Sequence, residues 1–186
     1  MSSASQQGPP MTPIARRILQ GTLVLLAAFA LAPLSCFQRA LAMDALPDAH
    51  FVGFARAVND FAISSGKLAL ARSATDIVRD YAALAVAEHT TAAQSLSKSL
   101  SDADVSYDGR MGPVTANALA QLSALQGPEF DAAFANVQVA VQIAAVVQFS
   151  AYSQNGTSDP LRRYATLMLP TSRMFLEYAH RLATSR

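Results

Sequence analysis

The sequence predicts an all-α protein, an antiparallel up-and-down four-helix bundle with one short extra crossover helix. Apolar residues recur every three or four positions through several stretches of about 25 residues, which is the spacing of one helix face. Hydrophobic residues make up 52% of the 186 positions and charged residues 15%. This balance is typical of one domain with closely packed helices. No stretch is a convincing strand.

The N-terminal segment has the pattern of an export signal. Arg16 and Arg17 precede an uncharged apolar run from Ile18 to Leu34. The small residues Ala40 and Ala42 follow at the two positions that a signal peptidase reads. The alternative is an uncleaved anchor in the inner membrane, because a run of about 17 residues reaches the short limit for crossing a bilayer.

Cleavage is expected after Ala42, which divides the chain into a signal peptide (1–42) and a mature helical domain (43–186), periplasmic or otherwise exported. The signal peptide removes Cys36, the only cysteine, so the mature chain has no thiol for a disulfide or a metal. It also removes three of the 14 basic residues and none of the 13 acidic ones, which makes the mature net charge −2. We therefore expect no nucleic-acid partner, and contact with a membrane only if the signal stays attached.

The first two helices are predicted from Asp48 to Arg72 and from about Thr75 to Leu100, with a break and a cap at Ser73–Asp76. The first apolar stripe consists of Phe51, Phe54, Val58, Phe61, Ser65 and Leu68. The second consists of Val78, Ala82, Ala85, His89, Ala92 and Leu96. His89 is therefore expected in the core, whereas Glu88, about 100° away around the axis, is expected on the flank.

Three further helices complete the predicted bundle. A short crossover helix is expected from Pro113 to Leu125, followed by long helices from Pro128 to about Gln154 and from Asp159 to Ala183. Pro170 either kinks or divides the last of these. The helix that begins at Pro128 is apolar nearly all round, which indicates either a central position or a membrane span. Its three glutamines between Val137 and Phe149 favour the central position, because unpaired amides are costly in lipid; they are Gln138, Gln142 and Gln148.

Four short motifs stand in a fixed order along the mature chain. They are GKLA at Gly66–Ala69, EHT at Glu88–Thr90, FD at Phe130–Asp131 and LPT at Leu169–Thr171. With these motifs, the chain from Phe51 to Ala183 resembles the exported bacterial proteins classed as domain of unknown function 4142. The resemblance implies a ferritin-like four-helix bundle outside the cytoplasm, and the family has no settled activity.

The resemblance also implies four inward polar positions. Members of the family typically carry a glutamate before the GKLA glycine, a histidine after an acid on the second helix, a histidine on the fourth helix, and a histidine after the LPT proline. This chain keeps His89, which Glu88 precedes. The other three positions are replaced by Ala62, Gln142 and Phe175.

The remaining acids and histidines are too few for a ferritin-like dinuclear centre. Such a centre takes glutamates from two helices and a Glu-x-x-His pair from each of two others. Glu177 and His180 form one such pair, but Glu88 and Glu129 are the only other glutamates. We therefore expect no metal cofactor. The alternative is a single iron or zinc ion bound by His89, Glu177 and His180.

His89 is expected instead to be a neutral core histidine that donates to a backbone carbonyl or to a glutamine on a facing helix. Burying an unpaired imidazolium would cost several kcal/mol. Gln142 is the candidate partner. His89, Glu88 and Gln142 are therefore the candidate polar core.

The segment from Tyr107 to Leu122 resembles the loop and helix of a small peptidoglycan-binding module. The matching residues are Asp108, Gly109, Gly112, Thr115, Ala118 and Leu119. Any connection between helices also needs glycines for a tight turn and a proline such as Pro113 to start a helix. The segment is moreover too short for a three-helix unit of its own.

The sequence shows no pattern for nucleophilic or nucleotide chemistry. It has no serine in a G-x-S-x-G turn, no cysteine in the mature chain and no glycine-rich phosphate loop. We expect an exported, non-catalytic helical-bundle protein whose partner is unknown. Two alternatives stay open: an envelope or peptidoglycan interaction module that uses Asp108–Leu119, and a periplasmic metal-binding or stress-related ferritin-like protein.

Overall fold

The structure is a computed structural model, and it describes residues 47–107 and 112–185. Within these ranges the chain is all-helical and forms no strand. The described helices are α3 (Asp48–Arg72), α4 (Asp76–Asp102), α5 (Pro113–Ser123), α6 (Gly127–Asn155) and α7 (Asp159–Thr184). The predicted signal peptide and its cleavage site lie outside the described residues.

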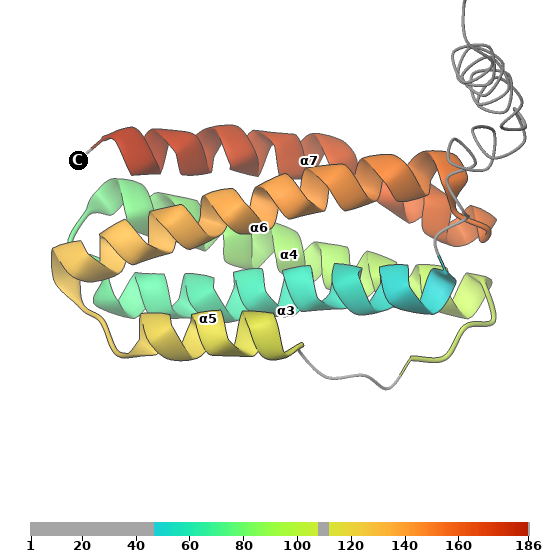
Figure 1. Cartoon of the computed structure of the whole chain (residues 1–186), viewed down its shortest axis with the longest axis horizontal. Coiled ribbons are helices and arrows are strands. Elements are labelled where there is room, and N and C mark those ends of the chain that lie inside the picture. The colour runs from blue at the N-terminus through green and yellow to red at the C-terminus, as the bar shows by residue number, and fades with distance from the viewer. Residues whose placement is uncertain (1–46, 108–111, 186) are drawn as a thin grey trace, which may run out of the picture. The chain divides into compact units, whose positions relative to one another are not determined.

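The four long helices lie side by side (Figure 1). α3 packs against α4 and α6, and α7 packs against α6 and α4. Connections of only three residues, 73–75 and 156–158, turn α4 back along α3 and α7 back along α6. Short connections of this kind leave successive helices antiparallel. The shorter helix α5 packs against α3 and α6.

Proline, serine and glycine define the helix ends. A proline stands in the first turn of α5, α6 and α7, where its missing N–H removes no intrahelical bond. At the start of α7, the Ser158 hydroxyl accepts a hydrogen bond from the Leu161 N–H at 3.5 Å. At the end of α6, a Cβ on Gly156 would stand 2.5 Å from the Tyr152 ring. Only glycine therefore fits beneath this ring.

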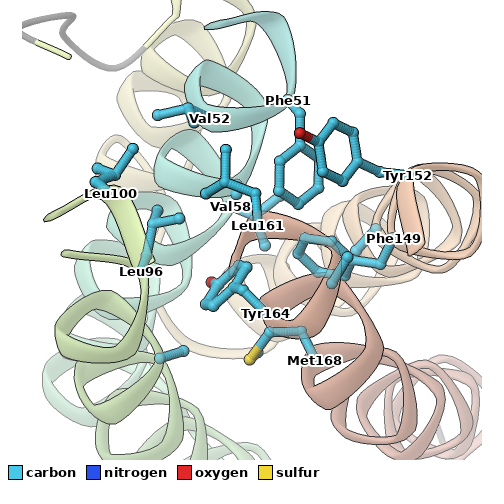
Figure 2. Packing of buried hydrophobic residues seen from close by; sticks show 14 residues of the cluster. Phe51, Val52, Val58, Leu96, Leu100, Phe149, Tyr152, Leu161, Tyr164 and Met168 are labelled. Carbon is cyan, nitrogen blue, oxygen red and sulfur yellow. The ribbon is translucent and has the colours of Figure 1, made fainter. Parts of the chain in front are cut away.

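The interior contains two apolar clusters. The first includes residues from the N-terminal half of α3. Figure 2 shows the aromatic rings of this cluster packed against one another. Phe51 stacks on Tyr152 with ring centroids 3.7 Å apart, and Phe149 meets Tyr164 edge-on at 6.1 Å. Each such pair contributes about 0.5–1.5 kcal/mol beyond the area that it buries. The second cluster includes Phe61, Tyr81, Phe130, Phe134 and Phe175.

Pro170 does not divide the last helix. α7 runs from Asp159 to Thr184 across this residue, which is exposed. Proline removes one intrahelical hydrogen bond. An exposed position lets water satisfy the carbonyl that is left without its partner.

By length and composition, α6 is the one described helix that meets the criterion for a membrane span. Buried core helices of other proteins meet the same criterion, and 39% of the most apolar window of α6 is buried. Two of its four glutamines, Gln138 and Gln142, are each only 1% exposed. α6 also packs against α3, α5 and α7. The face with Gln138 and Gln142 is therefore inside, whereas Ile143 and Val147 are 47% and 58% exposed, so α6 is not buried all round.

We expect Gly66→Ala to destabilise the fold by about 1–3 kcal/mol. A Cβ at Gly66 would stand 2.8 Å from Cγ2 of Val86 and 3.1 Å from the carbonyl oxygen of Ala82, both on α4. Urea unfolding of the purified protein measures the change. Adding Val86→Ala to the variant should restore part of the loss, because it removes the contacting methyl group.

Gly112→Ala is the matched control, since a Cβ at Gly112 meets no described atom within 4 Å. If Gly66→Ala were as stable as the wild-type protein, the close approach of α3 and α4 at this residue would be contradicted.

Candidate functional site

Buried polar side chains lie between the two apolar clusters. Each long helix has a buried polar residue between positions of the first cluster and positions of the second. We call these residues the polar layer, and each is 1% exposed. They are Asn59 in α3, His89 in α4, Gln142 in α6 and Ser172 in α7.

Asn59 connects the His89 imidazole to the Tyr164 hydroxyl. The Asn59 side-chain oxygen lies 2.9 Å from Nδ1 of His89, and its Nδ2 donates to the Tyr164 hydroxyl at 3.0 Å. An amide oxygen only accepts hydrogen bonds, so Nδ1 of His89 is the protonated nitrogen. The two bonds therefore join α3 to both α4 and α7.

Other atoms of the polar layer have no hydrogen-bond partner among the described residues. They are Nε2 of His89 and the Ser172 hydroxyl, whereas the Gln142 amide has the Tyr81 hydroxyl as a neighbour. A buried polar group without a partner costs about 1–3 kcal/mol. The layer therefore offers amide, hydroxyl and imidazole groups to a ligand, and none of its four side chains is a carboxylate.

A second set of polar contacts lies beside the layer. The Tyr81 hydroxyl donates to the side-chain oxygen of Gln138 at 3.2 Å, and Nε2 of Gln138 donates to the Ser65 hydroxyl at 3.0 Å. These bonds connect α4, α6 and α3. The amide of Gln138 is thus satisfied in the way that buried polar groups require.

Burial determines the protonation of the layer. It lowers the pKa of His89 to about 4, so the imidazole is neutral at pH 7. Burial also raises the pKa of Tyr164 to about 12 and raises the pKa of Tyr81, which the neighbouring Gln142 side chain partly offsets. The site at neutral pH therefore carries hydrogen-bonding groups without net charge.

The candidates for a single-ion site do not come together. His89 is buried, whereas Glu177 and His180 are exposed on α7. That helix buries Ser172 and Phe175, and positions 177 and 180 lie outside its buried stripe. Across residues 47–107 and 112–185, no group of three or more His, Cys, Asp or Glu side chains could hold a metal ion.

Two details of the predicted polar core are wrong. Glu88 is exposed on the flank of α4, as its place on the helix predicted, and does not belong to the polar core. The partner of His89 is Asn59 on α3, not Gln142. The sequence contains a signal for Asn59, because it follows Val52 and Ala55 at helical spacing on the buried face of α3.

Asp131 is a buried carboxylate that the sequence analysis did not select as a site. It accepts hydrogen bonds from the backbone N–H of Ala74 at 3.2 Å and from the Thr75 hydroxyl at 3.1 Å. Asp131 therefore holds the connection between α3 and α4 against α6, which is a structural role.

Two of the six residues that match the peptidoglycan-binding pattern, Asp108 and Gly109, lie outside the described residues. Among the others, the Thr115 hydroxyl donates to the carbonyl oxygen of Gly112 at 3.0 Å. This is a local bond at the start of α5. Because α5 packs against α3 and α6, it belongs to the same packed unit as the long helices.

A cavity of about 780 Å³ opens between α3, α5 and α6. None of the four polar-layer residues lines it. Its wall is mostly small and apolar, and includes Gly53, Ala57, Val114, Ala118, Val137 and Ala144.

One comparison with known proteins gives a match. The model of a family described as "Domain of unknown function (DUF4142)" matches residues 35–182. No curated protein and no solved structure matches the chain.

Stability is expected to fall as the pH decreases from 6.5 to 4, by up to about 3 kcal/mol from His89 alone. The pKa of this group is lowered in the folded state to about 4 from an ordinary 6.5. Between these values the unfolded chain binds the proton and the folded chain does not, so the contribution of His89 is complete above pH 6.5 and lost toward pH 4.

Urea unfolding of the wild-type protein and of His89→Gln at several pH values tests this. The variant should lack this part of the pH dependence, whereas His180→Gln, at an exposed position on α7, should keep it. Equal slopes for all three proteins would show that His89 titrates normally.

Proposed function

The chain belongs to the DUF4142 family, and from that premise we propose that it is an exported, ferritin-like helical bundle that acts by binding and not by catalysis. The family description supplies no activity. The proposal therefore depends on what the interior of this chain is able to do.

The arrangement of the long helices supports the ferritin-like bundle. α3 and α4 form one pair joined by a short connection, and α6 and α7 form another. The two pairs contact each other through α3 with α6 and through α4 with α7. The segment between α4 and α6 crosses from one pair to the other and contains α5. One long crossover between two helical hairpins is the connectivity of ferritin-like folds.

The chemistry of the polar layer is the observation that supports a non-catalytic role most strongly. A dinuclear centre in such a bundle takes four glutamates and two histidines, all facing inward. The polar layer has one imidazole, two amides and a hydroxyl. Such a donor set does not fit a resident dinuclear centre.

One of the replaced family positions lies beside His89. The Phe175 ring centroid is 5.4 Å from that of His89, where the resemblance implies a second imidazole. Ala62 and Gln142 are each 1% exposed and also face the interior. Apolar and amide groups thus fill the space that carboxylates and imidazoles would need.

The contacts of His89 also support the absence of acid–base catalysis. In a catalytic triad the imidazole is held by a carboxylate and contacts a nucleophile. Here the described contact of His89 is to the Asn59 amide. Burial keeps the pKa of His89 near 4, well below the range in which a general base acts at neutral pH.

Export is supported by the leader pattern at Arg16–Ala42. We propose a periplasmic or otherwise exported location, with an inner-membrane anchor as the alternative if the leader stays attached. An envelope-binding role through Asp108–Leu119 has weaker support, because α5 packs against α3 and α6 and does not form a separate module.

Protein purified from its native envelope should contain less than about a tenth of an equivalent each of iron, zinc and manganese. The polar layer lacks the carboxylates that would hold these ions. Elemental analysis by mass spectrometry measures the content. A stoichiometric amount of any of the three would show that the interior holds a metal.

A variant with Ala62→Glu, Gln142→His and Phe175→His provides the positive control. It restores the donors that the family resemblance implies, and it should take up cobalt(II) while the wild-type protein does not. Cobalt uptake by the wild-type protein would contradict the proposal as well.

The mature protein should begin at Met43, because Ala40 and Ala42 occupy the positions that signal peptidase reads. Intact-mass measurement on protein from the native envelope determines the N-terminus. Ala42→Arg should block the cleavage. A wild-type protein that keeps residues 1–42 would favour the anchored alternative.

A further inference from the structure

We propose that the cavity between α3, α5 and α6 binds the aliphatic chain of a single-chain amphiphile, such as a fatty acid or a fatty alcohol. The inference rests on the proposed binding role and names its site and its ligand class. The cavity measures about 780 Å³, within the range of about 300–1,000 Å³ that is usual for small-molecule sites.

The cavity exists because small side chains face one another across three helices. On α3, Gly53 and Ala57 are four residues apart and share a face. Ala118 on α5 and Ala140 and Ala144 on α6 complete the wall. None of these side chains is long enough to fill the space between the helix axes, which leaves room for a ligand.

The wall has no charged Asp, Glu, Lys or Arg side chain among its described residues. Val58 is buried in this wall, and Val137 and Val141 are half-buried, whereas Ala140 and Ala144 stand at its exposed edge. Burying apolar surface here gains about 25 cal/mol per Å², whereas burying a charge or an unpaired polar group would cost several kcal/mol. The body of the ligand is therefore aliphatic.

Polar groups lie toward the end of the cavity where α3 begins. His50 and the Tyr107 side chain belong to the wall there. A Cβ on Gly53 would stand 3.0 Å from the Tyr107 hydroxyl, which places this hydroxyl directly against α3. An imidazole and a phenol at one end of an apolar cavity match a ligand with one hydrogen-bonding head group.

The exposed apolar edge of the cavity gives such a ligand a route of entry. Val114, on the first turn of α5, belongs to the wall and is 81% exposed. Exposed apolar groups that continue into a cavity are typical of ligand-binding grooves. A second copy of the chain is the other occupant that an apolar rim allows, and the experiment distinguishes the two.

The test uses the full mature protein and a dansyl-labelled undecanoic acid, with lauric acid and dodecanol as competitors. We expect enhanced dansyl fluorescence with a Kd on the order of micromolar, and displacement by both competitors. Ala140→Phe fills the cavity and should weaken binding by about tenfold or more. Ala83→Phe is the matched control, because Ala83 is exposed on α4 and does not line the cavity.

Urea unfolding and circular dichroism confirm that both variants are folded. The inference is wrong if the wild-type protein does not bind the probe, or if Ala140→Phe binds it as tightly as Ala83→Phe does. It is also wrong if sedimentation shows a wild-type dimer that Ala140→Phe dissociates, because the cavity would then be covered by a second copy.

The ligand inference and the proposed function are contradicted by different experimental outcomes. Absence of probe binding ends this inference and leaves the metal-free interior in place. A stoichiometric metal ends the proposed non-catalytic role, whether or not the probe binds.

Discussion

The hydrogen bonds of Asn59 are the interaction on which the interior of this protein depends. Asn59 contacts both the His89 imidazole and the Tyr164 hydroxyl, so one side chain on α3 fixes a polar group on α4 and another on α7. Buried polar groups are tolerated when they have such partners. The apolar clusters on either side of the polar layer stabilise the fold by burying apolar side chains. The directional bonds of Asn59 favour one alignment of the helices along their axes.

The same bonds support the proposal that the interior carries out no acid–base or metal chemistry. An amide partner leaves the imidazole neutral, whereas a carboxylate would raise its pKa and orient it for catalysis or metal binding. The Phe175 ring beside His89 increases the burial further. The described cavity with room for a ligand lies elsewhere. The cavity formed by α3, α5 and α6 is lined by small residues such as Gly53 and Ala140, and it is separate from the polar layer.

The sequence predicted the helices well and their mutual contacts poorly. Apolar periodicity and the Ser73–Asp76 break predicted α3 with the observed bounds and α4 within two residues. The same periodicity correctly placed His89 in the core. It did not identify Asn59 as its partner, because the partner depends on how α3 and α4 are aligned along their axes. The Glu177–His180 spacing was misleading, since i,i+3 spacing shows that two side chains share a face but not which face is buried.

Nitrogen-15 NMR of the His89 side chain tests the central claim most directly, with His89→Gln used to assign its signals. The account predicts a neutral imidazole at pH 7 with the proton on Nδ1, as the bond to Asn59 requires. It also predicts that one equivalent of zinc(II) leaves these signals unchanged. An imidazolium at pH 7, or a zinc-induced shift at Nε2, would contradict a polar layer that serves packing and hydrogen bonding alone.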